Sequence, residues 1–169
     1  MNKLKYSEYK KNIKSGDLLV WNKGEESFKS KLVLFIIRLF TLSEYSHVGI
    51  AWKVSDRLFI IEATIPRVRI VPLSNQDGFY HIPMKIKWKK AYTDYLLSRV
   101  GERYSLREAI LGYLGKTTPD DRHWQCAELA NTFYKNVGTD FGDANTPSKL
   151  VKAILEQTEA ELHYVSISK

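Results

Sequence analysis

The stretch SHVGIAWKVSDRLFIIEAT, residues 46–64, decides the fold that we predict from the sequence. Its first half alternates bulky apolar residues with a histidine and two small residues: Val48, Ile50 and Trp52 against His47, Gly49 and Ala51. A period of two is typical of a β-strand with two different faces. The turn-like segment SDR then leads into a second apolar run, RLFIIEAT. The stretch therefore predicts an antiparallel β-hairpin.

Two polar residues stand out in this hairpin. Glu62 lies in the apolar run LFIIEA, and a buried carboxylate without a partner is energetically costly. If Lys53 pairs with Leu58 beside the turn, Glu62 lies near Gly49 and within diagonal reach of His47. The small Gly49 also leaves room for another backbone to approach the imidazole. The pattern favours a His47–Glu62 pair, with a structural histidine and a water-facing edge glutamate as open alternatives.

The rest of the chain supplies strands first and helices afterwards. The period of two continues to Met84 and predicts an antiparallel meander over 46–84, after a short strand at 17–21 and an amphipathic helix at 27–42. Further elements are expected as follows: helices at 89–101, at 105–115 with a Ser105–Glu108 capping box, from Cys126 to near Gly138, and from Pro147 with Thr146 as cap, then a strand at 161–167. This order predicts an α+β fold in a single domain of residues 1–169.

The chain has a single cysteine, Cys126, in DRHWQCAELANTFY at residues 121–134, where a helical pattern begins. A thiol in the first turn of a helix lies at the positive end of the helix dipole, and a nearby imidazolium lowers its pKa further, which favours a reactive thiolate. Asp120 and Asp121 are expected to cap this helix, and their charges would oppose the thiolate if they faced the sulfur. A small buried core residue is the alternative role for Cys126.

These residues give the chain a resemblance to a known family. The segments SGDLLVW, YSHVGIAW, IIEA and WQCAEL, within residues 15–150, resemble the NlpC-type papain-like superfamily, in particular its circularly permuted branch with YiiX-like amidases and, more distantly, lecithin retinol acyltransferase. The order His, Glu, Cys resembles that branch, whereas ordinary papain-like enzymes carry the cysteine first. The resemblance implies a papain-like fold, with an antiparallel sheet packed against the cysteine helix. It also implies Cys126 as nucleophile, His47 as base and Glu62 as the residue that orients the imidazole.

Further residues near these three are weaker candidates. The resemblance suggests Tyr104, in GERYSL, as a residue that lines the site, with a packing role as the alternative, and Tyr45 is a further candidate for the lining. The backbone N–H of Cys126 is expected to contribute to an oxyanion hole, because the first N–H groups of a helix have no partner within it. Gln125 receives no role, because adjacent helical positions point about 100° apart.

The predicted function is that of a cysteine hydrolase, an amidase, peptidase or esterase that works through a thioester. The expected substrate carries an amide or ester bond, as in a peptide, a peptidoglycan fragment or a lipid. Two alternatives stay open: an acyltransferase that passes the acyl group to an amine or alcohol, and a non-catalytic binding module with the same fold. The sequence has no phosphate-binding glycine loop and no Cys/His metal spacing, so no cofactor or metal is implied, and His81 and His123 match nothing in the family pattern.

Charge and composition limit the partners and the location. Lysine and arginine total 26 against 19 acidic residues, and the net charge of +7 attracts anionic surfaces, although a solubilising basic surface is the simpler explanation. No basic helix with interleaved aromatics indicates specific nucleic-acid binding. The most apolar run, residues 32–40, is too short to span a bilayer, and residues 1–17 contain no signal-peptide core. A cytoplasmic location is therefore expected.

Overall fold

The protein is described by a computed structural model that covers residues 4–22, 44–104 and 123–167. The described elements of one large sheet are β1 (Leu4–Lys5), β2 (Leu18–Asn22), β3 (Tyr45–Val54), β4 (Arg57–Ala63), β5 (Val68–Pro72), β6 (Gly78–Ile82) and β9 (His163–Ser166). The helices are α1 (Tyr6–Tyr9), α3 (Lys90–Arg99), α5 (Cys126–Asn136) and α6 (Pro147–Gln157), with short 3-10 turns η1 (Lys10–Asn12) and η2 (Leu73–Asn75). The short strands β7 (Arg103–Tyr104) and β8 (His123–Trp124) pair with each other.

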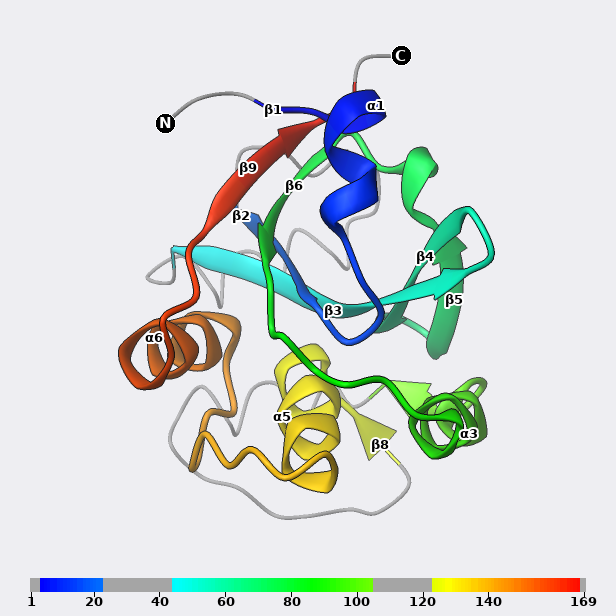
Figure 1. The fold of residues 1–169 in the computed structure, drawn as a ribbon. Helices are drawn as coiled ribbons and strands as arrows, with labels where there is room; N and C mark the ends of the chain where they lie inside the picture. The colour runs from blue at the N-terminus through cyan, green and yellow to red at the C-terminus, as the bar shows by residue number, and fades with distance from the viewer. Residues whose placement is uncertain (1–3, 23–43, 105–122, 168–169) are drawn as a thin grey trace.

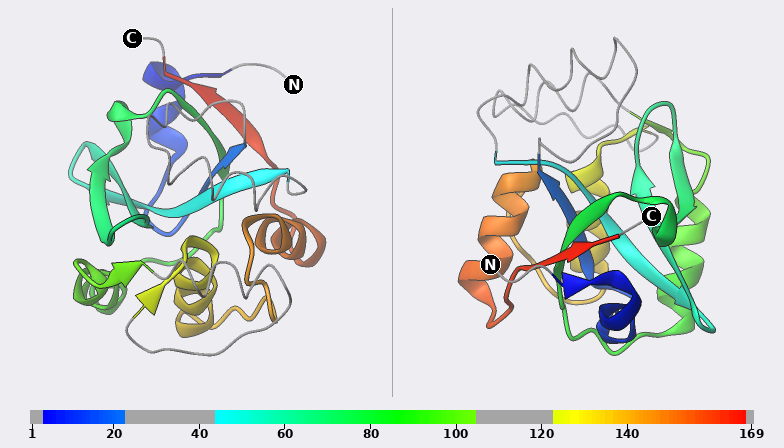
Figure 2. Two further views of the ribbon diagram at one scale, coloured as in Figure 1. Left: turned by 180° about the vertical axis from the view of Figure 1, so that it is seen from behind. Right: turned by 90° about the horizontal axis from the view of Figure 1, so that it is seen from above.

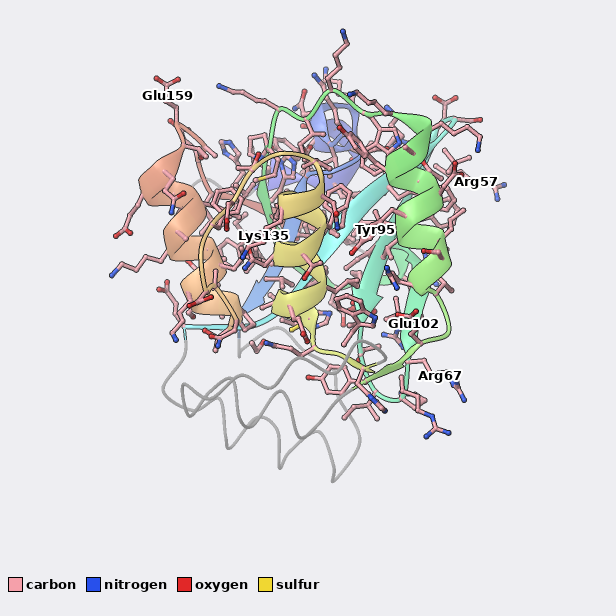
Figure 3. The ribbon with its side chains drawn as sticks, turned by 90° about the horizontal axis from the view of Figure 1, so that it is seen from below. Arg57, Arg67, Tyr95, Glu102, Lys135 and Glu159 are labelled. Carbon is pink, nitrogen blue, oxygen red and sulfur yellow. The ribbon has the colours of Figure 1, made fainter. Side chains whose placement is uncertain are left out.

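The large sheet has seven strands in the order β1-β9-β6-β2-β3-β4-β5. Its pairs are antiparallel except β1 with β9, so the class is mixed α and β with a mostly antiparallel sheet, as the sequence predicts. The sheet curves above α6, α5 and α3, which follow one another along its lower side (Figure 1). Seen from below, the same three helices lie next to one another across the sheet (Figure 3).

The hairpin of β3 and β4 has the predicted register. Lys53 pairs with Leu58 beside the turn, and Ile50 pairs with Ile61 farther along. This register follows from the two-residue turn at Ser55 and Asp56, because the turn length fixes which residues face each other. The prediction for the hairpin is therefore confirmed residue by residue.

The expected meander over 46–84 is only partly correct. Strands β3, β4 and β5 follow one another across the sheet, but β6 returns to the other side and pairs with β2 and β9. The alternation in GFYHI predicts a two-faced strand and says nothing about its partner. The free side of β2 accepts β6 because both faces of the resulting pair are buried: Leu18 pairs with Ile82 in one core, and Leu19 and Phe79 lie in the other.

The alternating side chains divide the interior into two cores. One core lies between the sheet and the helices and contains Val48 and Ile50 of β3 together with Phe133 of α5. The other lies on the opposite side of the sheet, contains Ala51 and Ile60, and is covered by residues of α1. Figure 2 shows α1 and α5 on different sides of the sheet. The two faces predicted for SHVGIAW are therefore both buried, each in a different core.

The remaining helices agree with the predictions where the structure describes them. Helix α3 lies within the expected 89–101, and the hydroxyl of Thr146 accepts a hydrogen bond from the backbone N–H of Lys149, with Pro147 in the first turn of α6. The predicted helices at 27–42 and 105–115, the Ser105–Glu108 capping box and the apolar run 32–40 lie outside the described residues. Among the helices of the described ranges, none has the length and apolar character needed to cross a membrane.

Candidate active site

The central pair of the site joins β3 and β4. His47 Nε2 lies 2.6 Å from Glu62 Oε2, and their side chains are 16% and 4% exposed. A contact this short is typical of a charge-assisted hydrogen bond. The register of β2 against β3 shifts between Trp21 and Asn22, directly beside His47, and such bulges re-aim the side chains next to them. The predicted pair is present, and the alternative of a water-facing glutamate is wrong.

Glu62 has a second partner, Arg69 of β5. The two residues are directly opposite each other on neighbouring strands, and Arg69 donates from Nε over 2.8 Å and from Nη2 over 2.7 Å to the same oxygen, Glu62 Oε1. Arg69 was not predicted from the sequence, because its contact depends on the register of β4 with β5 and not on that of the first hairpin. The signal was available: the alternation in RVRIVPL places Arg69 on the face of β5 opposite to Val68 and Ile70.

Gly49 lies beside the pair for a reason other than the predicted one. A Cβ added to Gly49 would lie 2.4 Å from Cδ1 and 2.6 Å from Cγ1 of Ile60, and 3.2 Å from Cβ of Glu62. The space beside His47 is therefore filled by side chains of β4, and the expectation that another backbone approaches here is wrong. The physical reason is the hairpin itself, whose register brings Ile60 and Glu62 over the glycine.

Cys126 is the first residue of α5 and is 3% exposed. Its thiol is a neighbour of His47 and helps to raise the pKa of the imidazole. Because Nε2 of His47 bonds Glu62, Nδ1 is the ring nitrogen that remains for a second partner. The imidazole therefore lies between a carboxylate and a thiol that sits at the start of a helix.

The charges of this cluster change the pKa values of both His47 and Glu62. Burial alone would lower the pKa of His47, but the Glu62 carboxylate and the neighbouring Cys126 outweigh it and raise that pKa well above its usual value. Burial alone would raise the pKa of Glu62, yet the positive charges of His47 and Arg69 lower it. The arrangement thus stabilises an imidazolium next to the thiol and an ionised carboxylate behind it.

The start of α5 differs from the prediction. Gln125 is the N-cap, with φ −101° and ψ 161°, and forms a capping box with Glu128, whose carboxylate accepts from the backbone N–H of Gln125. The Gln125 side-chain amide donates to the backbone carbonyl of Asn145. Asp120 and Asp121 lie outside the described residues and do not occupy the N-cap position. Gln125 therefore has a structural role, which its extended backbone conformation permits.

The two candidate lining residues occupy different places. Tyr104 is half-buried, and burial together with the nearby negative charges of Cys126 and Glu128 raises its pKa well above the usual value, so it lies in the electrostatic neighbourhood of the thiol. Tyr45 is oriented toward α6. Its backbone N–H donates to the hydroxyl of Ser148, and it lines a pocket of about 460 Å³ together with residues of α6.

The histidines that the family pattern does not match lie elsewhere. His81 of β6 is almost fully buried, with Nε2 2.9 Å from Asp17 Oδ2 and Nδ1 3.0 Å from the hydroxyl of Tyr9. His123 lies in β8, where it pairs with Arg103. In the described ranges no three His, Cys, Asp or Glu side chains are grouped so that they could hold a metal ion.

Comparison with known proteins adds a likeness at the level of the fold. Neither the protein-family models nor the curated proteins include a match to the chain. Among solved structures, the metalloprotein YiiX from Escherichia coli O157:H7 matches with a TM-score of 0.56 and 18% sequence identity, over 76% of this chain and 69% of that chain. The fold is similar to that of YiiX. At this identity the likeness to YiiX concerns the fold alone, and it agrees with the YiiX-like resemblance of the sequence.

Proposed function

We propose that the protein is a cysteine-dependent hydrolase of amide or ester bonds, with a permuted papain-like arrangement of its catalytic residues. The observation that carries the proposal is the position of His47, which bonds the Glu62 carboxylate through Nε2 and is a neighbour of the Cys126 thiol at the start of α5. The raised pKa of His47 supports it, because an imidazolium stabilises a neighbouring thiolate. Glu62 fixes the ring orientation and the charge that this requires.

The reaction would proceed in two balanced steps. In the first, the Cys126 thiolate bonds to the carbonyl carbon, the carbon–nitrogen or carbon–oxygen bond breaks, and the His47 imidazolium gives its proton to the leaving amine or alcohol. In the second, His47 takes a proton from water as the water oxygen attacks the thioester. The carboxylic acid leaves, and the sulfur recovers the ion pair with His47. Glu62 stays ionised throughout and holds the imidazole in place.

The start of α5 supplies the stabilisation of the oxyanion in this proposal. The backbone N–H of Cys126 belongs to the first turn of the helix, where N–H groups have no carbonyl partner within the helix. A developing oxyanion on the attacked carbonyl is therefore placed near a donor and near the positive end of the helix dipole. The substrate class that follows from this chemistry is a molecule with an amide or ester bond.

YiiX is described as a metalloprotein, which raises the question of a metal in this chain. The described residues fit poorly, because they contain no group of three or more potential ligands, and the donors nearest to Cys126 are already hydrogen-bonded to one another. We therefore derive no step through a metal ion.

The test is turnover of amide and ester substrates by the wild type and by Cys126→Ala and Cys126→Ser. We expect both variants to fold with an unchanged thermal transition and to lose turnover. Retention of full activity in folded Cys126→Ala contradicts the proposal. Product analysis with an added amine or alcohol separates hydrolysis from acyl transfer, because only transfer yields the new amide or ester.

A further inference from the structure

The carboxylate of Glu62 has two oxygens, and each serves a different partner. Oε2 bonds His47 Nε2 at 2.6 Å, whereas Oε1 receives both the Nε and the Nη2 donors of Arg69. Two converging donors on one oxygen fix the plane of the carboxylate more firmly than a single donor does. The second oxygen is thereby left entirely to the imidazole.

We propose that Arg69 is a positioning residue of this site, which holds Glu62 through Oε1 and so presents Oε2 to His47. The inference rests on the proposed cysteine hydrolase function. Arg69 acts on His47 indirectly, because it bonds Glu62 and Glu62 bonds His47. Its role is that of a fixed positive charge on the far side of the carboxylate.

The burial of the three groups explains why such a residue is needed. Glu62 is 4% exposed, and one imidazole is a weak compensation for a carboxylate at that depth. Arg69 is 48% exposed, so its guanidinium retains part of its hydration while two of its donors bond the buried oxygen. It comes from β5, the edge strand of the sheet, directly opposite Glu62. The pairing of β4 with β5 therefore delivers the charge to the carboxylate.

The charges around the pair define what removal of Arg69 would change. The groups that face Glu62 are His47 of β3 and Arg69 of β5, and the group that faces His47 from α5 is Cys126, with Tyr104 and Glu128 in the surroundings of the thiol. Without Arg69, the pKa of Glu62 rises because burial is opposed by His47 alone. As the pH falls, Glu62 would then lose its charge earlier, and the His47 imidazolium beside the thiol would lose its counter-charge.

The experiment compares Arg69→Met with the wild type by the rate of Cys126 alkylation with iodoacetamide as a function of pH. We expect the acid limb of the profile to move up by about one pH unit in the variant. The matched control is Arg57→Met. Arg57 is exposed at the start of β4 and extends away from the ribbon in Figure 3, and its side chain makes no hydrogen bond or ion pair within the described part of the chain. Its substitution leaves the limb in place.

A second readout is the imidazole signal of His47 in a pH titration by NMR, assigned against His47→Ala among the four histidines of the chain. Arg69→Lys keeps a charge but only one point of contact, so we expect a smaller shift in the same direction. If Arg69→Met does not fold, the position of the acid limb in Arg69→Lys tests the role of Arg69.

The outcomes separate the two proposals. An activated wild-type thiol with an unchanged acid limb in the folded Arg69 variants overturns the role of Arg69 and leaves the hydrolase proposal standing. A wild-type Cys126 with the reactivity of an ordinary thiol overturns both. A purely structural contribution of Arg69 would lower the thermal transition without moving the limb, and this too counts against a positioning role.

Discussion

The molecule contains two histidine–carboxylate pairs, and their comparison shows how much the neighbours of such a pair decide. In both, Nε2 of the ring bonds a buried carboxylate, at 2.6 Å for His47 with Glu62 and at 2.9 Å for His81 with Asp17. Three of the four residues lie on strands of the same sheet, and Asp17 directly precedes β2. On geometry alone, the two pairs would be equally good candidates for a catalytic histidine.

The pair of His81 and Asp17 is surrounded by further hydrogen-bond partners. Asp17 accepts from the backbone N–H of Lys14 at 2.7 Å and of Met84 at 3.0 Å, and the second ring nitrogen of His81 bonds the hydroxyl of Tyr9. The exposed fraction of the His81 side chain is 1%. Every polar side-chain atom of the pair thus has a partner, which is the arrangement of a structural network that joins α1 and the segment before β2 to β6.

The pair of His47 and Glu62 is open by comparison. The carboxylate is held by a side chain, Arg69, in place of backbone N–H groups, and the imidazole keeps an exposed fraction of 16%. The other neighbour of the ring is the thiol of Cys126, a group that can lose its proton. A histidine and a carboxylate therefore form an enclosed structural pair in one place and, in the other, the pair that the proposed function uses for proton transfer.

The largest expected effects come from truncating each histidine in turn. His47→Ala should lower turnover by about 10²- to 10⁴-fold, the usual contribution of a general base, and should destabilise the protein less than His81→Ala does, because Glu62 keeps Arg69. His81→Ala should instead lower the free energy of unfolding by about 3 kcal/mol, since it opens a buried pair, and leave turnover of the folded protein near that of the wild type. Urea unfolding and steady-state rates measure both, and a reversed pattern would invalidate the comparison.

A second, smaller effect concerns pH. The pKa of Glu62 is lowered, so its contribution to stability is present above the unfolded value of 4.5 and lost as the pH falls through the folded value. The pKa of His47 is raised, so its contribution is present below 6.5 and lost as the pH rises through the folded value. The stability difference between wild type and Glu62→Gln should therefore be largest between these limits. Urea midpoints measured from pH 4 to 9 test this, and parallel curves would contradict it.

The smallest expected effect concerns Gly49, which lies beside the His47–Glu62 pair. Gly49→Ala places a methyl group against Ile60 and the Glu62 side chain, which we expect to cost about 1 to 3 kcal/mol and to reduce turnover by displacing Glu62. The double variant Gly49→Ala/Ile60→Ala should be more stable than the sum of the single effects predicts, because the methyl group occupies space that Ile60 leaves. Simple additivity would show that Gly49 does not support this pair.

The sequence predicted the parts of the fold that depend on short-range rules. The Lys53–Leu58 pairing was predictable because a two-residue turn fixes it, and the Thr146–Pro147 start of α6 because a cap and a first-turn proline identify it. The pairing of β6 with β2 was not predictable, because alternation defines the faces of a strand and does not specify which strand pairs with it. The N-cap of α5 was misassigned to the better-capping residue types Asp120 and Asp121, whereas the capping box formed at Gln125.

The residues of the candidate site also divide into those that short-range rules predict and those that they do not. His47 and Glu62 could be paired from the sequence because one hairpin contains both, and Cys126 could be joined to them only through the resemblance to a family. Arg69 was missed because its contribution depends on a second register, that of β4 with β5. The assignment of Nε2 to Glu62 is a matter of ring orientation, which no pattern of residues specifies.

The charged row formed by His47, Glu62 and Arg69 on three neighbouring strands also bears on the order in which contacts form during synthesis of the chain. These three residues lie on consecutive strands joined by short turns, so their contacts close small loops, whereas Cys126 follows much later in the chain. We expect the strands to be able to assemble the charged row before the helix that bears the sulfur has left the ribosome. Under the proposed function, Cys126 would then become reactive only when α5 docks, at the completion of folding.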